Sequence, residues 1–105
     1  MKIEPTNDVW AVQTLRLVQA LLGAISPNFR MVAIAHDGHR WKLMFVLEED
    51  LVEDRQEIED IAVEFEALQE KPIAYEVTVS VVTSRIEWPP QSVRVVYRRR
   101  EVKYR

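Results

Sequence analysis

The sequence predicts an α+β domain whose elements follow the order αββαββ. Apolar residues recur at helical spacing over residues 8–25 and again after Asp50, which indicates two helices. Asp37-Gly38 separates two apolar runs, as in a hairpin turn, and residues 73–83 alternate as in a half-buried strand. We therefore expect one domain over residues 1–105, a two-layer sandwich in which both helices cover one face of a four-stranded antiparallel sheet and leave the other face partly wet.

The first helix is expected to begin near Asp8, because Asn7 or Asp8 can accept hydrogen bonds from the N–H groups of the first turn. Gly23 and Pro27 should end it. Polar residues are few along this segment, so we expect the helix to lie deep against the sheet. Its apolar positions are Trp10, Leu15, Leu17, Val18, Leu21, Leu22 and Ile25.

Residues 29–47 are predicted to form a β-hairpin around Asp37-Gly38. A two-residue type I′ turn places His36 opposite His39 and fixes the register of the two strands. Counting outward then pairs Ile34 with Trp41, Val32 with Leu43, and Arg30 with Phe45. One face of the hairpin is consistently apolar and should face the core; it consists of Val32, Ile34, Trp41, Leu43 and Phe45.

The second helix has Asp50 as a candidate N-cap, and Glu53 three residues later completes an acidic variant of the capping box. It should finish near residues 71–72, because Pro72 cannot continue a helix. The expected buried stripe is Ile58, Ile61, Ala62, Phe65 and Leu68. After the strand at residues 73–83, a loop at residues 88–91 leads to a last strand at about residues 93–99, with Val93, Val95 and Tyr97 opposite Arg94, Val96 and Arg98.

The composition excludes several kinds of chemistry and location for this protein. Cysteine is absent, which removes disulfides, thiolate chemistry and cysteine-based metal sites. The N-terminal residues lack the apolar run of a signal peptide, and no uncharged stretch approaches the roughly 18 residues that a membrane span needs. We therefore expect a soluble, cytoplasmic protein without membrane contact.

Convergent catalytic or metal-binding groups are hard to find. His36 and His39 flank the hairpin turn beside Asp37 and could form half of a metal site, but the chain has no third His to complete it. We expect them to be polar residues at a solvated tip. With only Gly23 and Gly38, the chain has no glycine-rich phosphate loop. The sequence thus predicts a protein without cofactor, metal, small-molecule substrate or enzymatic activity.

Charge is concentrated in the second helix and the loop before it. Residues 48–70 hold eleven acidic side chains and a single basic one, Arg55. Like charges three or four residues apart cost about 0.2–0.5 kcal/mol per pair, so this helix either serves a basic partner by charge complementarity or is an ordinary solvated face. At 100° per residue one stripe is Glu53, Glu57, Asp60 and Glu64, and a second is Glu59, Glu66 and Glu70. The candidate partner-binding residues here are Glu49, Asp50, Glu53, Glu57, Asp60 and Glu64.

Two further features admit two interpretations each. Residues 94–105 hold six basic side chains and Glu101; they could contact nucleic-acid phosphates, or protect an edge strand and pair with the acidic helix. Because the whole chain is negatively charged, we favour the structural role over direct nucleic-acid binding. Trp88 stands beside Pro89-Pro90, either as an interface anchor or folded back over the sheet edge, and it completes the candidate partner-binding set.

Three segments together resemble a known group of proteins. These are residues 20–30 (ALLGAISPNFR) leading into a hairpin, the acidic second helix, and residues 96–101 (VYRRRE). They resemble the bacterial immunity proteins of contact-dependent growth inhibition systems and related polymorphic toxins, over nearly the whole chain in layout. The resemblance implies a protein that binds the C-terminal toxin domain of its own system, often a nuclease, and blocks its active site or substrate path.

The charge pattern agrees with that implication, since carboxylates can occupy a basic cleft in place of phosphates. The leading hypothesis is therefore an immunity protein that neutralises a basic nuclease toxin through the acidic helix. Two alternatives remain open: a nucleic-acid-binding module that uses the basic last strand, and a regulatory or assembly domain that forms homo-oligomers through an exposed strand edge.

Overall fold

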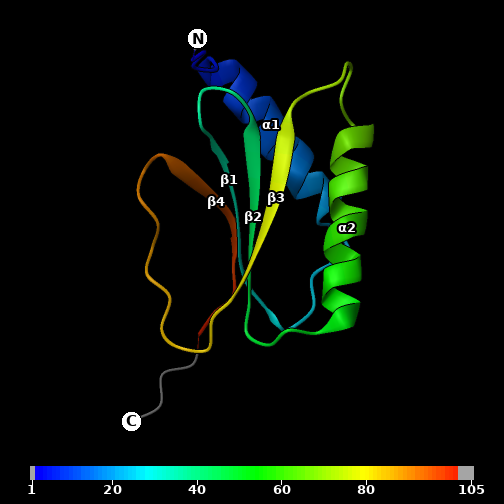
Figure 1. Ribbon diagram of the computed structural model, residues 1–105, viewed down its shortest axis with the longest axis vertical. Coiled ribbons are helices and arrows are strands. Elements are labelled where there is room, and N and C mark those ends of the chain that lie inside the picture. Colours follow the sequence, from blue (N-terminus) through cyan, green and yellow to red (C-terminus); the bar gives the residue numbers. More distant parts are fainter. Residues whose placement is uncertain (1, 102–105) are drawn as a thin grey trace.

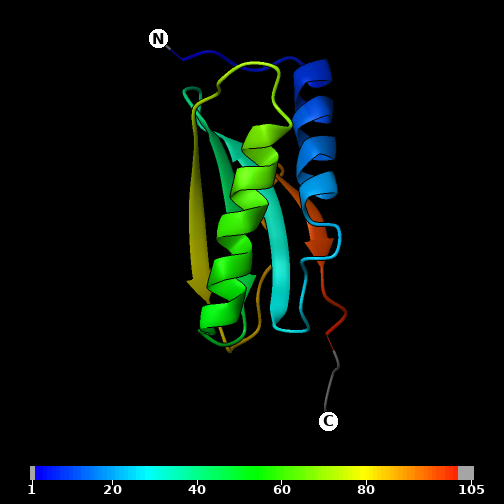
Figure 2. The same ribbon diagram turned by 90° about the vertical axis from the view of Figure 1, so that its right-hand side faces the viewer.

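The computed structural model describes residues 2–101 and shows two helices and four strands in the expected order (Figure 1). Both helices lie side by side on one face of the sheet (Figure 2). The α+β class and the αββαββ order are confirmed. The elements are α1 (Asn7–Ala20), β1 (Phe29–His36), β2 (Trp41–Leu47), α2 (Val52–Ala67), β3 (Tyr75–Val81) and β4 (Val93–Arg98).

The sheet has the strand order β3-β2-β1-β4, and β1 is antiparallel to both of its neighbours. In contrast to the expected antiparallel sheet, β3 pairs parallel with β2, from Trp41 opposite Tyr75 to Leu47 opposite Val81. The reason is α2, which carries the chain back along the sheet so that β3 starts at the same end as β2. Strand β2, helix α2 and strand β3 thus form a βαβ unit inside a mostly antiparallel sheet.

The connection from β3 to β4 must cross the sheet, because these strands occupy opposite edges. The helices cover one face, so residues 82–92 pass over the other; we call this segment the crossing loop (Figure 1). Ile86 of the crossing loop is buried, and so is nearly every residue of β1, on both of its faces. The face of β1 that was expected to be partly wet is therefore covered.

The hairpin register differs by two residues from the expected one. His36 pairs with Trp41, and residues 37–40 form a four-residue loop in which the Asp37 N–H donates to the Arg40 carbonyl at 3.2 Å. The Asp37 carboxylate causes this, because it accepts from the N–H groups of His39 and Arg40, both at 2.9 Å. A shift of two preserves the faces, so the predicted core face is right: Val32, Ile34, Trp41, Leu43 and Phe45 are all buried.

Helix α1 begins after an N-cap at Thr6, whose hydroxyl accepts from the Val9 N–H, so the expected caps were one or two residues late. Of its expected apolar positions, Leu17 and Leu21 are buried, but Leu15 is 67 % exposed and Leu22 76 %, so the helix is less deeply buried than expected. The buried side instead consists of Gln13, Leu17, Ala20 and Leu21.

The chain just after α2 determines which side of α1 is buried. The amides of Gln13 and Gln69 bond to each other in both directions at 2.8 Å, and Arg16 also donates to Gln69 at 2.8 Å. These bonds turn the polar Gln13 inward, toward the chain that follows α2. On α2 itself the predicted stripe is confirmed for Ile58, Ile61, Ala62 and Phe65, which are all buried, while Leu68 is half-buried.

Strand β4 departs from simple alternation. Val32 pairs with Tyr97 and Ala33 with Val95, so Val96 is an extra residue in the ladder. Tyr97 therefore faces the helices, on the same side as Val32, and not the side of Val95 as the sequence predicted. Arg98, opposite Met31, faces the crossing loop.

Candidate partner-binding surface

Four carboxylates of α2 form a continuous exposed row, as the 100° spacing predicts. They are Glu53, Glu57, Asp60 and Glu64, and we call them the acidic stripe. All four are exposed, and none has an ion-pair partner among residues 2–101. The buried side chains of α2 anchor the helix to the sheet and hold the acidic stripe outward.

The acidic stripe lies on the flank of α2 that faces α1. The opposite flank is marked by Arg55, Glu59 and Ala62, which line a hollow together with Val77 and Val79 of β3. At 100° per residue the acidic stripe falls on the other side of the buried row. Since α1 runs beside α2 on the same face of the sheet (Figure 2), the stripe borders the exposed surface of α1.

The second acidic stripe is partly engaged within the fold. Glu66 accepts a hydrogen bond from the hydroxyl of Tyr75 on β3 at 3.0 Å. Burial, and then this bond to Glu66, raise the pKa of Tyr75. Glu59 and Glu70 are exposed. One carboxylate of this second stripe, Glu66, therefore stabilises the fold through its bond to Tyr75. No carboxylate of the acidic stripe makes a comparable bond within residues 2–101.

Asn28 fixes the start of α2. Its side-chain amide donates to the Glu49 carbonyl and to the Asp54 carboxylate, and its oxygen accepts from the Glu49 N–H, each at 2.8 Å. Asp54 is only 5 % exposed, so the bond from Asn28 satisfies a buried carboxylate. Sequence reasoning missed this pair. The available signal was that Asp54 lies four and seven residues before Ile58 and Ile61, on their buried face.

The carboxylates before α2 differ in their environment. Asp50 is not the N-cap: Leu51 occupies that position and makes no side-chain cap bond. Asp50 instead pairs with Arg55 at 2.5 Å, and this hydrogen bond lowers the pKa of Asp50. Glu49 is exposed and lines a hollow with Glu53. Glu49 thus lies next to the acidic stripe, whereas the charge of Asp50 is paired with Arg55.

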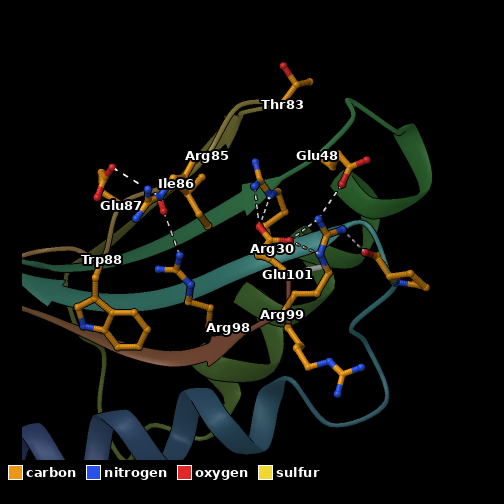
Figure 3. Close-up of a pocket in the computed structure, with 12 residues that line it drawn as sticks. Arg30, Glu48, Thr83, Arg85, Ile86, Glu87, Trp88, Arg98, Arg99 and Glu101 are labelled. Carbon is orange, nitrogen blue, oxygen red and sulfur yellow. Dashed lines mark hydrogen bonds and ion pairs between the residues drawn. The ribbon is translucent and has the colours of Figure 1, made fainter. Parts of the chain in front are cut away.

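Trp88 lies apart from these carboxylates. It belongs to the crossing loop and is 67 % exposed. The Arg98 guanidinium lies 5.0 Å from its ring centroid, on the face of the sheet away from the helices. Trp88, Ile86 and Arg98 line the same pocket (Figure 3). The structure therefore does not bring Trp88 and the acidic stripe into one surface.

Arg30 of β1 and Arg99, just after β4, hold the crossing loop and the ends of the strands together (Figure 3). Arg30 is buried, pairs with Glu101 at 2.6 Å, and donates to the carbonyls of Val82 and Ser84, each at 2.6 Å. Arg99 pairs with Glu48 at 2.7 Å and with Glu101 at 2.8 Å. Hydrogen bonds from Arg99 and then Arg30 lower the pKa of Glu101.

Within residues 94–101, the ion pairs of the basic segment go to Glu48 and Glu101 and none goes to α2, so the expected pairing with the acidic helix is wrong for these residues. Arg98 donates to the Ile86 carbonyl at 3.0 Å, and its buried Nη1 has no hydrogen-bond partner among residues 2–101. The remaining basic residues of the predicted segment, 102–105, lie outside the described residues. The structural interpretation of this segment agrees with the contacts at residues 98–101.

The hairpin tip is organised by hydrogen bonds. Nδ1 of His36 accepts from the Gly38 N–H at 3.0 Å, and its ring contacts Trp41 edge-on. Within residues 2–101, no three His, Cys, Asp or Glu side chains are grouped so that they could hold a metal ion. In the same range, neither helix combines the length and apolar character needed to cross a membrane.

A family model described as MafI2 immunity protein matches residues 12–101, from within α1 to the end of the described chain. The chain belongs to the MafI2 immunity protein family. Its partner is therefore a cognate toxin, and the expectation of an immunity protein is confirmed at this level. The part that matches the MafI2 family includes the acidic stripe, the Asn28–Asp54 pair and the crossing loop. Among curated proteins, none matches the chain.

Proposed function

We propose that this MafI2 protein neutralises a nuclease toxin of a contact-dependent growth inhibition or related polymorphic toxin system, inside the bacterial cytoplasm. The acidic stripe occupies the basic cleft with which the toxin grips nucleic acid. One observation carries the proposal: four exposed carboxylates in a row have no ion-pair partner within residues 2–101. Family membership supports a toxin as the partner.

Repulsion within the acidic stripe destabilises helix α2 in the isolated protein. The stripe contains three like-charge pairs at spacings of three or four residues, each of which destabilises a helix by about 0.2–0.5 kcal/mol. No basic residue lies in the last turn of α2, where a cation would stabilise the helix. Binding to a basic surface removes this repulsion and also accelerates encounter with the partner.

The dimensions of the acidic stripe suit a nucleic-acid cleft. From Glu53 to Glu64 the helix rises by about 16 Å at 1.5 Å per residue. That length equals about five nucleotides of one strand at 3.4 Å each. Carboxylates spread over this length can contact several of the Lys and Arg side chains that would otherwise bind phosphates, which blocks the substrate path directly.

The contacts at the basic end favour this reading over a nucleic-acid-binding module. Arg98 and Arg99, which such a module would use, are occupied by the Ile86 carbonyl and by Glu48 and Glu101. A phosphate backbone would have to displace these bonds. The acidic stripe would repel it at the same time.

The test is inhibition of the cognate toxin domain, which we expect to be encoded beside the gene for this protein, with two charge-matched variants. The stripe variant carries Glu53→Gln, Glu57→Gln, Asp60→Asn and Glu64→Gln. The control variant removes four carboxylates elsewhere, by Glu4→Gln, Glu59→Gln, Glu66→Gln and Glu87→Gln. We expect the stripe variant to bind on the order of 100-fold more weakly, since truncating buried interface charges costs several kcal/mol, and the control to bind like the wild type.

Three results separate the parts of the proposal. Equal binding by both variants would contradict the assignment of the acidic stripe, but not the immunity function. Tight inhibition of a toxin that is not a nuclease would contradict only the toxin class. A wild-type protein that leaves the adjacent toxin active would contradict the function itself.

A further inference from the structure

Helix α1 and the turn after it present a row of large apolar side chains to solvent. The row consists of Val12, Leu15, Val18 and Leu22, and we call it the α1 apolar ridge. Leu15 and Leu22 are 67 % and 76 % exposed, and Val12 and Val18 are 43 % and 38 % exposed. The buried side of α1 points elsewhere because it is centred on Gln13, Leu17 and Ala20. A continuous apolar row at this exposure is typical of an interaction surface.

The α1 apolar ridge lies beside the acidic stripe. Helices α1 and α2 run in opposite directions on one face of the sheet (Figure 2). The start of α1 lies against the end of α2, since Val12 and Arg16 line a hollow with Glu70 and Pro72. The far end of the ridge, at Leu22, is therefore at the same end of the layer as Glu53. The apolar row and the charged row thus run alongside each other.

We infer that the α1 apolar ridge and the acidic stripe form one composite interface, and that the partner is a protein surface with an apolar patch bordered by basic side chains. This inference rests on the proposed function and adds α1 to the site. In such an interface the apolar side chains form the centre, and the charges at the border set orientation and association rate.

The charges beside the ridge exclude other occupants. Nucleic acid and anionic membranes would both be repelled by the acidic stripe, and the ridge has no aromatic side chain on which a base could stack. A second copy of the chain would bring a second acidic stripe, while α1 offers one cation, Arg16, which already donates to Gln69. A basic toxin domain matches both rows at once.

The experiment measures affinity for the adjacent toxin domain by calorimetry, with two matched double variants of the full chain. Leu15→Ser with Leu22→Ser removes the two most exposed side chains of the ridge. Val52→Ser with Val63→Ser removes two side chains of similar exposure, 67 % and 66 %, on the outward side of α2, where Val63 lines the hollow beside β3. Circular dichroism verifies that both variants are folded, and Leu15→Ala with Leu22→Ala replaces the first variant if it is not.

We expect the ridge variant to bind on the order of 100-fold more weakly, as for interface hot spots, and the control to bind within about threefold of the wild type. The loss should persist at high salt, because burial of apolar surface is not screened. Equal affinity of the two variants, with tight wild-type binding, would overturn the inference and leave the proposed function standing. A wild-type dimer that the ridge variant dissociates, with toxin affinity unchanged, would assign the ridge to self-association instead. Absence of wild-type binding would overturn both.

Discussion

The guanidinium of Arg30 lies 2.6 Å from the carboxylate of Glu101 and, on its other side, 2.6 Å from two carbonyls of the crossing loop. One buried side chain of β1 thus joins the strand to the chain after β4 and to the loop that covers the sheet. Arginine suits this position because its planar group donates in several directions at once.

Replacement of Arg30 should therefore destabilise the whole fold. Arg30→Met keeps the apolar stem but leaves the carbonyls of Val82 and Ser84 without donors. We expect a loss of about 3 kcal/mol in the free energy of unfolding, measured by urea denaturation. Arg30→Lys should recover only part of it, because an ammonium group cannot span the same acceptors. A loss below about 1 kcal/mol for Arg30→Met would show that the crossing loop is held by other contacts.

The hydrogen bond between Asn28 and Asp54 contributes to the stability of the fold and also holds the start of α2, which carries the acidic stripe. Asn28→Ala removes the donor to a buried carboxylate, so we expect about 2 kcal/mol of destabilisation and weaker toxin binding, because the start of α2 is released. Asn28→Asp should cost more, since two carboxylates then face each other. Adding Asp54→Asn to Asn28→Asp restores a donor and an acceptor, and a double-mutant cycle should show this rescue. Additive effects would contradict a direct contact.

The environment of Asp37 should make the free energy of unfolding depend on pH, and this effect can be measured at a single residue. Hydrogen bonds from the N–H groups of Arg40 and His39 lower the pKa of Asp37 from 3.8 to about 2. Because the folded pKa is below the unfolded one, the stabilisation is complete above about pH 4 and is lost as the pH falls toward 2. Asp37→Asn keeps an acceptor for the turn but does not titrate. Its unfolding free energy should therefore depend less steeply on pH between 2 and 4.

The direct check on Asp37 is NMR titration of its carboxyl carbon. We expect a midpoint near pH 2, in line with the lowered pKa. A midpoint near 3.8 would mean that the Asp37 side chain does not hold the four-residue loop in solution.

Periodicity predicted the features that depend on one-sided burial. The buried stripe of α2 has a charged opposite side, and the large apolar residues of the hairpin core face alternate with smaller or more polar ones such as Ala33, Ala35 and Lys42, so each pattern has a single solution. Helix α1 has apolar residues nearly all round, so its sequence alone does not say which side is buried. That choice depends on the tertiary bonds between Gln13 and Gln69.

The features that sequence reasoning missed depend on contacts between distant segments. The register of the hairpin depends on a side-chain bond of Asp37, and the parallel pairing of β3 depends on the path of α2. In the candidate site, the acidic stripe follows from helical spacing alone. The separation of Trp88 from the acidic stripe follows only from the crossing loop, whose course is set by strand order.

The most direct test of toxin neutralisation through the acidic stripe is the association rate constant with the cognate toxin domain, measured by stopped flow across a range of ionic strengths. For the wild type and the charge-matched control variant we expect fast association that slows steeply as salt rises. For the stripe variant we expect slow association with little salt dependence. If the stripe variant keeps the rate and salt dependence of the wild type, the acidic stripe does not face the toxin.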